Sequence, residues 1–223
     1  MIIFGNNNLA EMLYYEAEKY SDKSFTIEAF CVDHKYIDTE HFCGKPLFSL
    51  EEVIIKFPPN KCNMISTALC STSGLRQRMI VFNKLKKLGY TLANYISPLA
   101  DVCQSVQMGE NNIILSFSRV GLEAKLGNAN ILWNGVILDH NANVGDGNFF
   151  AGGCKMAGHV SIGNNCWIGI NSTIIEETNI ADETLVGAGA VIVKNTQKFT
   201  TYVGNPARAI STHQKEGIFL KQN

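Results

Sequence analysis

The chain has 223 residues, a formal net charge of −1, 46 % hydrophobic residues and 17 % charged residues. This mixture is typical of a globular protein, and its near-neutral charge gives no reason to expect nucleic acid or an anionic membrane as a partner. The N-terminus lacks a cationic stretch followed by a long apolar run, and no segment approaches the roughly 18 apolar residues of a transmembrane helix. We therefore expect a cytoplasmic protein.

The first part of the chain alternates strand and helix signals. The predicted elements are a strand at 2–4, a helix at 9–20, a strand at 25–32, a short element at 46–55, a strand at 64–68, a helix at 75–88 and a strand at 91–96. This order favours a small parallel sheet covered by helices. We expect a Rossmann-like α/β domain over residues 1–97.

The turn after the first predicted strand is Gly5 followed by Asn6, Asn7 and Asn8. A strand that leads into a helix through such a turn leaves free N–H groups, which can bind an anion. Asparagine also occurs in turns for purely conformational reasons. Both readings stay open, and the absence of G-x-G-x-x-G gives a dinucleotide little support.

The second part of the chain repeats every six residues. A large apolar residue recurs without a break at Met108, Ile114, Val120, Leu126, Leu132, Leu138, Val144, Phe150, Met156, Ile162, Ile168, Ile174, Ile180, Val186 and Ile192. A period of six fits neither a helix nor a simple strand, and the hexapeptide unit is typical of a parallel β-helix. We expect this solenoid over residues 98–208, followed by a tail at 209–223 that is partly helical at best.

Three hexapeptides per coil give coils of 18 residues, so the fifteen repeats make five coils. Residues 18 apart should then stack about 4.8 Å apart. One predicted column contains His140 and has Gly158 directly above it; a second contains the mostly small residues Gly152, Ile170 and Ala188. Such columns expose backbone against which a thin, extended ligand could lie.

The seven cysteines are odd in number and include no C-x-x-C pair, which indicates reduced thiols. Cys154 and Cys166 occupy the small, inward position of their repeats, and we expect both in the core. His140 can act as a general base or be an ordinary solvated histidine. We expect His159 to be structural or solvated. A zinc site needs at least three converging ligands, and no third solenoid histidine exists, so we expect no metal.

Several segments together resemble a known family. They are FGNNN, VILDHNANVGDGNF, GNNCWIGINSTI, VGAGAVIVKN and the closing VGNPAR. In combination they resemble the sugar O-acyltransferase family of left-handed β-helix proteins, and in particular the bacterial nucleotide-amino-sugar N-acetyltransferases and the sialic-acid O-acetyltransferases. The resemblance implies a homotrimer of left-handed β-helices, with acetyl-CoA bound in the groove between neighbouring subunits.

The resemblance also implies roles for single residues. His140 matches the family's base, and Asn141 stands where the family has an acid beside it; the second family histidine falls on Phe149. Cofactor contacts fall on Gly158, Ile170 and Ala188. Contacts to a sugar nucleotide fall on Asn6, Asn7, Asn8, Asp33 and Lys35.

The first functional hypothesis is acetyl transfer from acetyl-CoA to the amino group of a UDP- or dTDP-linked 4-amino-4,6-dideoxy sugar in surface-glycan biosynthesis. His140 would take the proton, and a backbone N–H near Gly158 would stabilise the oxyanion. O-acetylation of a sugar hydroxyl and a non-catalytic binding scaffold are the alternatives. Trp133 and Trp167 are predicted to point outward, where they mark a subunit interface or pack on their own chain.

Overall fold

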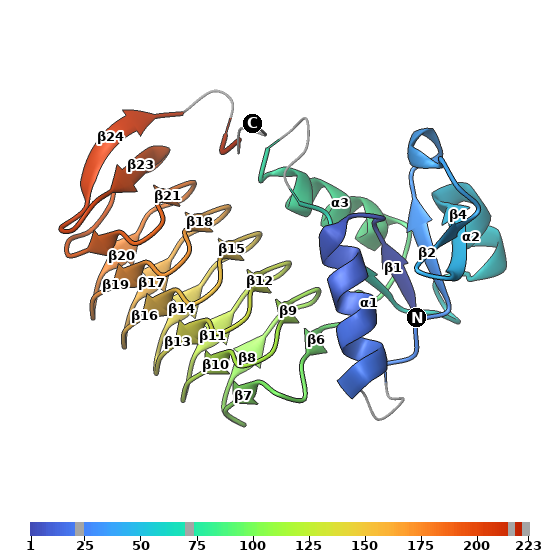
Figure 1. The fold of residues 1–223 in the computed structure, drawn as a ribbon, viewed down its shortest axis with the longest axis horizontal. Coiled ribbons are helices and arrows are strands. Elements are labelled where there is room, and N and C mark those ends of the chain that lie inside the picture. The colour runs from blue at the N-terminus through green and yellow to red at the C-terminus, as the bar shows by residue number, and fades with distance from the viewer. Residues whose placement is uncertain (21–24, 70–73, 214–216, 220–223) are drawn as a thin grey trace.

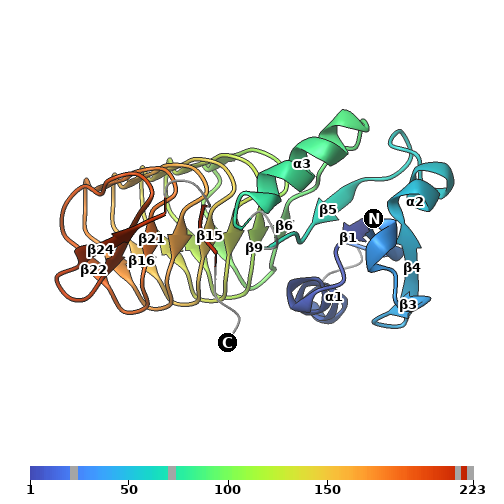
Figure 2. The same cartoon turned by 90° about the horizontal axis from the view of Figure 1, so that it is seen from above.

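The computed structural model describes residues 1–20, 25–69, 74–213 and 217–219. It contains an N-terminal α/β domain and a long solenoid whose strands are stacked in parallel rows (Figures 1 and 2). The N-terminal domain lies beside the first coils of the solenoid, with α1 on one face of its sheet and α3 on the other (Figure 2).

The N-terminal domain is built on one five-stranded sheet. Its elements are β1 (Ile2–Phe4), α1 (Asn8–Tyr20), β2 (Ala29–Val32), the 3₁₀ turn η1 (His34–Tyr36), β3 (His41–Phe42), β4 (Lys45–Ser49), α2 (Leu50–Lys56), β5 (Met64–Ser66) and α3 (Gln77–Lys87). The sheet order is β3-β4-β2-β1-β5, in which only β3 is antiparallel to its neighbour.

Local signals explain where these helices begin. Asn7 caps α1, because its side-chain oxygen accepts a hydrogen bond from the Ala10 N–H at 3.0 Å. Ser49 and Glu52 form a reciprocal capping box at the start of α2. The element predicted at 46–55 is thus a strand and a helix joined at Ser49.

The solenoid has three sheets. The first contains β7 (Asp101–Val102), β10 (Arg119–Val120), β13 (Ile137–Leu138), β16 (Lys155–Met156), β19 (Thr173–Ile174) and β22 (Val191–Ile192). The second contains β8 (Gln107–Met108), β11 (Lys125–Leu126), β14 (Asn143–Val144), β17 (Ser161–Ile162) and β20 (Asn179–Ile180). The third contains β6 (Tyr95–Ile96), β9 (Ile113–Ile114), β12 (Ile131–Leu132), β15 (Phe149–Phe150), β18 (Trp167–Ile168), β21 (Leu185–Val186), β23 (Thr200–Val203) and β24 (Arg208–Thr212).

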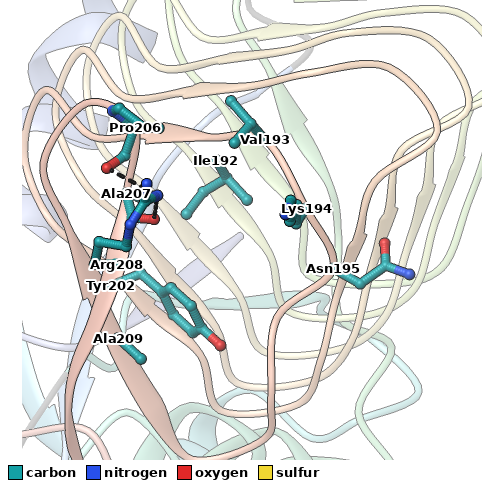
Figure 3. Close-up of a pocket in the computed structure, with 9 residues that line it drawn as sticks. All are labelled: Ile192, Val193, Lys194, Asn195, Tyr202, Pro206, Ala207, Arg208 and Ala209. Atoms are coloured by element: carbon teal, nitrogen blue, oxygen red, sulfur yellow. Dashed lines mark hydrogen bonds between the residues drawn. The ribbon is translucent and has the colours of Figure 1, made fainter.

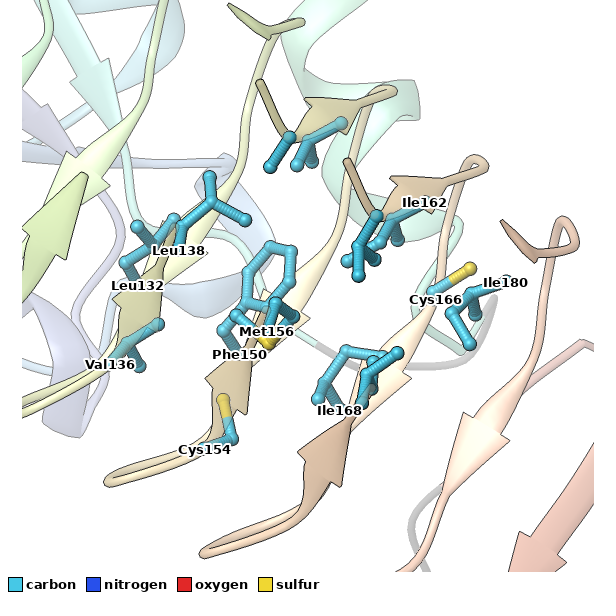
Figure 4. Packing of buried hydrophobic residues seen from close by; sticks show 14 of the residues in the cluster. Leu132, Val136, Leu138, Phe150, Cys154, Met156, Ile162, Cys166, Ile168 and Ile180 are labelled. Atoms are coloured by element: carbon cyan, nitrogen blue, oxygen red, sulfur yellow. The ribbon is translucent and has the colours of Figure 1, made fainter. Parts of the chain in front are cut away.

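Register between strands confirms the 18-residue coil. Leu138 pairs with Met156, and Val144 pairs with Ile162, each across one full turn. The sixth-position residues from Ile114 onward are buried and fill the interior, as Figure 4 shows for the middle coils. Cys154 and Cys166 are fully buried there as expected, and burial raises the pKa of both thiols to about 12.

A ladder of buried and half-buried asparagines joins successive coils at the corner between the second and third sheets. The side-chain oxygens of Asn94, Asn112, Asn130 and Asn148 each accept the backbone N–H found 18 residues later, at 2.7–3.1 Å. The last of these bonds comes from Cys166. The ladder satisfies corner N–H groups that the strand pairing leaves over.

The outer rows of the three sheets differ in character. The third sheet presents Ile113, Ile131, Phe149, Trp167 and Leu185, and the N-terminal domain packs on them. The second sheet presents Gln107, Lys125, Asn143, Ser161 and Asn179. The first sheet presents a mixed row, Asp101, Arg119, Ile137, Lys155, Thr173 and Val191. Only the third sheet is apolar throughout, and its own chain covers it.

Trp133 and Trp167 pack on their own chain. The Trp167 ring is stacked on Phe149 with centroids 4.1 Å apart, and Trp133 lies 5.7 Å from the same ring. Both join the cluster that includes Leu9 and Leu13 of α1. Of the two readings the sequence left open, the structure has the intramolecular one.

Two sequence expectations need correction. Tyr95–Ile96, part of the strand predicted at 91–96, pairs with β9 of the solenoid, and only a single bridge from Leu92 to Met64 reaches the N-terminal sheet. The described tail is not helical, because β23 and β24 form an antiparallel hairpin that continues the third sheet beyond β21. Ile218 then returns to Leu75, whose N–H donates to its carbonyl at 2.9 Å.

Candidate active site

The predicted base and the predicted cofactor-binding residues lie on two edges of the solenoid. The His140 edge is the corner between the first and second sheets, where residues 139–142 link β13 to β14. The Ala188 edge is the corner between the third and first sheets, where residues 187–190 link β21 to β22. The same two corners recur in every coil.

His140 is half-buried and its imidazole is held on one side. Its Nδ1 lies 3.1 Å from the side-chain oxygen of Asn141, and its backbone N–H donates to the Asp139 carboxylate at 2.8 Å. An amide oxygen can only accept, so this contact places the proton on Nδ1 and leaves Nε2 as the basic nitrogen. Asn141 has a φ of 55°, a left-handed conformation that asparagine tolerates well.

Gly158 makes room for this ring from the coil above. A β-carbon on residue 158 would lie 2.6 Å from Nε2 and 3.1 Å from Nδ1 of His140. The predicted column is therefore a real contact between the imidazole and a glycine backbone. Gly158 is buried, so its backbone is not exposed as the column predicted. The Gly158 N–H has no hydrogen-bond acceptor among the described residues.

His159 is a neighbour of His140 that the sequence analysis set aside. Its ring centroid lies 5.1 Å from that of His140 at an interplanar angle of 83°. Its backbone N–H donates to the His140 carbonyl at 3.0 Å, and its side chain is exposed. Two imidazoles therefore lie together on the His140 edge.

Ile170 and Ala188 lie on the Ala188 edge, not beside His140. Both are exposed, and a β-carbon on the adjacent Gly189 would meet nothing within 4 Å. The three residues expected to contact the cofactor are thus split within one chain, with Gly158 on one edge and Ile170 and Ala188 on another. The first sheet separates the two groups.

A cavity of about 470 Å³ opens where β1 and β2 end in the N-terminal domain. Its lining consists of Phe4, Gly5, Asn6, Asn7, Asn8, Val32, Asp33, Tyr36, Ala68, Leu69, Gln77 and Val81. The predicted substrate residues Asn6, Asn7, Asn8 and Asp33 are therefore brought together. Lys35 is not part of the lining; its ammonium lies over the Tyr36 ring, 4.8 Å from the centroid.

Not all of these side chains are free to bind. Asn7 uses its oxygen to cap α1 and its amide to donate to the Thr67 carbonyl at 3.0 Å. Asp33 forms an ion pair with Lys84 of α3. Asn8 is exposed, and Asn6 makes only a long bond of 3.4 Å to the Tyr36 carbonyl.

Sequence reasoning missed Lys84, Gln77 and Tyr36 as members of this region. Lys84 lies in the helix predicted at 75–88, and nothing in the sequence connects it to Asp33, which is 51 residues away. Buried Arg78 was missed as well; its guanidinium donates to the carbonyls of Ala68 and Ala129 and so joins the cavity wall to the solenoid.

A second cavity of about 430 Å³ lies at the C-terminal end of the solenoid (Figure 3). The last coil and the β23–β24 hairpin form its walls, with Lys194 and Arg208 as its charged residues. Lys194 belongs to the same column as His140 and Gly158, since the three positions differ by multiples of 18. The sequence analysis contained no prediction for this cavity.

The described residues offer neither a metal site nor a membrane-spanning helix. Within the described ranges, no three His, Cys, Asp or Glu side chains converge in a way that could hold a metal ion. None of the described helices has the length and apolar character to cross a bilayer.

Comparisons with known proteins agree with this architecture. Residues 159–194 match the bacterial transferase hexapeptide (six repeats) family. No curated protein sequence matches the chain significantly.

Among solved structures, GDP-perosamine N-acetyltransferase from Caulobacter crescentus, in complex with CoA and GDP-perosamine, matches at a TM-score of 0.84 and 21% identity over 94% of this chain and 96% of that one. The acetyltransferase domain of PglB from Neisseria gonorrhoeae, in complex with acetyl coenzyme A, matches at a TM-score of 0.83 and 20% identity, over 94% of this chain and 98% of that one. WeeI from Acinetobacter baumannii matches at 0.82 and 22% identity over the same shares. The fold is therefore that of the left-handed β-helix acetyltransferases.

Proposed function

We propose that this protein is an acetyl-CoA-dependent N-acetyltransferase that acts on the amino group of a nucleotide-linked amino sugar. The observation that carries the proposal is the His140 imidazole lying against Gly158, with Nδ1 held by Asn141. The likeness to acetyltransferases whose complexes contain CoA and GDP-perosamine supports it. We extend the sugar class to GDP-, UDP- and dTDP-linked 4-amino-4,6-dideoxy sugars.

In the proposed reaction the sugar amine attacks the thioester carbonyl. His140 accepts the proton from the attacking nitrogen at Nε2, because Asn141 keeps the other ring nitrogen protonated. The N–H of Gly158, which has no acceptor among the described residues, is the donor that we assign to the oxyanion. The thioester is already activated, so no covalent enzyme intermediate is required.

The N-terminal cavity is the proposed site for the nucleotide. The order β4-β2-β1-β5 places the third, second, first and fourth parallel strands side by side, as in one half of a Rossmann fold. Ligands of such sheets bind at the carboxyl ends of the strands, where this cavity lies between Phe4 and Val32. Asn6, Asn8 and the free oxygen of Asp33 are the polar groups we assign to the sugar nucleotide, and Asn7 positions them by capping α1.

The proposed cosubstrate site requires two subunits. His140 and Ala188 lie on different edges of one chain, so a ligand that touches both must bridge a neighbouring copy. The two edges of the first sheet expose apolar side chains that no part of the described chain covers, namely Leu99, Phe117, Leu122, Ile170, Ile175 and Val193. We propose that these surfaces meet around a three-fold axis, which brings the His140 edge of one subunit to the Ala188 edge of the next.

The decisive experiment mixes the protein with acetyl-CoA and a panel of nucleotide-linked 4-amino sugars, with the matching 4-hydroxy sugars as controls. Release of free CoA thiol together with an acetylated amino sugar by mass spectrometry is the expected result. Acetylation of the hydroxy sugars alone would favour an O-acetyltransferase. Failure to bind CoA in calorimetry would favour a scaffold, although neither the free backbone at Gly158 nor the N-terminal cavity is then explained.

Assembly is tested separately. Light scattering should give a trimer, and His140→Ala mixed and refolded with Ala188→Val should regain part of the activity that each lacks alone. A fully active monomer would contradict the shared site, as would refolded mixtures that recover nothing.

A further inference from the structure

His159 is the nearest titratable side chain to the proposed base, and the mechanism above leaves it unused. Its ring is nearly perpendicular to that of His140, with 5.1 Å between centroids. The His159 side chain is exposed, whereas His140 is half-buried. A backbone hydrogen bond from His159 N–H to the His140 carbonyl fixes the two residues in adjacent coils.

The chemistry of an amine acceptor requires more than one proton transfer. An aliphatic amine arrives at neutral pH as R–NH₃⁺, and it must lose one proton before it can attack and another as the C–N bond forms. The balanced reaction is R–NH₃⁺ + CH₃CO–S–CoA → R–NH–CO–CH₃ + CoA–SH + H⁺. One of the two protons ends on sulfur, and the other must reach solvent.

His140 alone serves only one of these protons at a time. It can hold the second proton and return it to the departing sulfur, but the first must leave before its ring is basic again. Its Nδ1 is occupied by Asn141, so the first proton, which arrives at Nε2, must also leave from Nε2 before the amine attacks. The exit for the first proton must therefore be a group beside the ring.

We propose that His159 is this exit: it accepts the first amine proton from His140, directly or through one water molecule, and passes it to solvent. The proposal rests on the N-acetyltransferase function. His159 acts through His140 and is a proton-relay residue, with no contact to the reacting atoms. A hydroxyl acceptor would not need it, since R–OH donates a single proton that ends on sulfur.

The charges along this edge fit a transient imidazolium. Asp139 is in the same coil as His140, and Glu123 lies one coil below Asn141. Glu176 and Glu177 lie one coil above Gly158 and His159, and the Glu177 N–H donates to the Gly158 carbonyl at 3.1 Å. Lys194 is the only cation in the columns that contain these residues, and it lies two coils above Gly158. The three neighbouring columns of this edge therefore carry four carboxylates and one lysine, a balance that favours a positive charge on His159.

The test compares His159→Phe with wild type on the amino-sugar substrate between about pH 6.5 and pH 9.5. Phenylalanine keeps a planar ring against His140 but cannot carry a proton. We expect kcat to fall about tenfold at neutral pH, less than the roughly 10²–10⁴-fold effect of a lost general base, because His140 itself remains and the amine can also lose its first proton to water. The deficit should shrink as pH rises and the amine arrives uncharged. His41→Phe, on the exposed β3 edge of the N-terminal domain, is the matched control and should leave the profile unchanged.

Two results would overturn the proposal: a His159→Phe variant with wild-type turnover at every pH, or one with the same deficit at every pH, which would indicate a packing role. These results differ from failure of the proposed function itself, in which wild type acetylates no amino sugar at any pH.

Discussion

The imidazole of His140 and the backbone of Gly158 lie against each other across one turn of the solenoid, with Nε2 only 2.6 Å from the place where a β-carbon on residue 158 would be. The strand pairing of Leu138 with Met156 sets this approach, because it puts the two corner segments in register. Any side chain at position 158 must displace the ring.

Gly158→Ala is expected to reduce turnover strongly while the solenoid stays folded. The added methyl group pushes the imidazole away from its position, so the base loses its alignment with the attacking nitrogen. Steady-state kinetics should show a fall in kcat, with an unchanged circular dichroism spectrum. Wild-type kcat in this variant would mean that the ring can move without cost and that the contact is incidental.

His140→Ala should lower kcat by about 10²–10⁴-fold, the usual effect of losing a general base. The variant should keep the oligomeric state of wild type, since the His140 side chain contributes nothing to the solenoid core. His140→Gln is a useful companion, because it retains hydrogen bonding but cannot accept the proton. If either variant stays within a few-fold of wild type at neutral pH, His140 is not the base.

Asn141→Asp is expected to move the acidic limb of the pH–rate profile to higher pH. A carboxylate next to Nδ1 stabilises the imidazolium, so the base stays protonated up to a higher pH. The rate should therefore reach its plateau at a higher pH than in wild type. Aspartate also tolerates the left-handed backbone at this position. An unchanged profile would show that residue 141 does not influence the protonation of His140.

Ala188→Val should weaken CoA binding without affecting the amino sugar. Ala188 is exposed on its edge, where the branched side chain would occupy the space proposed for the pantetheine arm. Calorimetry should show a higher Kd for CoA, whereas affinity for the nucleotide sugar, bound in the N-terminal cavity, should not change. Wild-type CoA affinity would place the cosubstrate elsewhere on the solenoid.

Cys154 and Cys166 should resist alkylation by iodoacetamide at pH 8 in the folded protein. Both are fully buried, and a pKa of about 12 leaves only a trace of thiolate at that pH. Cys62 and Cys103 are half-buried and should react first. Peptide mapping after brief labelling will rank the sites, and denaturant should expose every cysteine; early labelling of Cys154 would mean that the coils open.

The solenoid was predictable because its six-residue repeat can be read directly along the sequence, and the position of a residue in the repeat determines which way it faces. A residue such as Ile168 must face the interior if residues 18 apart stack, and the same arithmetic places Gly158 above His140. The hairpin at Thr200–Thr212 breaks the six-residue period, and the pattern therefore could not reveal that the third sheet continues there. The six-residue repeat also could not show that the N-terminal domain covers Trp167.

The site was predictable only in part. Stacking of residues 18 apart predicted the contact between His140 and Gly158. It does not by itself show at which corner of the coil a column lies, and so it did not show that Ala188 and His140 lie on different edges. The ion pair of Asp33 with Lys84 joins elements that are distant in sequence. The capping role of Asn7 depends on where α1 begins, and helix boundaries are the least certain part of any such prediction.

The asparagine ladder helps to fix the spacing between successive coils of the solenoid. Strand pairing joins every coil to the next, and up to Cys166 one asparagine amide per turn adds to it, so the rod can lengthen or shorten only in whole steps of 18 residues, or roughly 4.8 Å. Duplicating the coil between Met156 and Ile174 would move Ala188 one coil farther from His140 along the solenoid axis and leave both residues unchanged. A cosubstrate of fixed length would no longer span the two, and the variant would measure how far the bound molecule reaches.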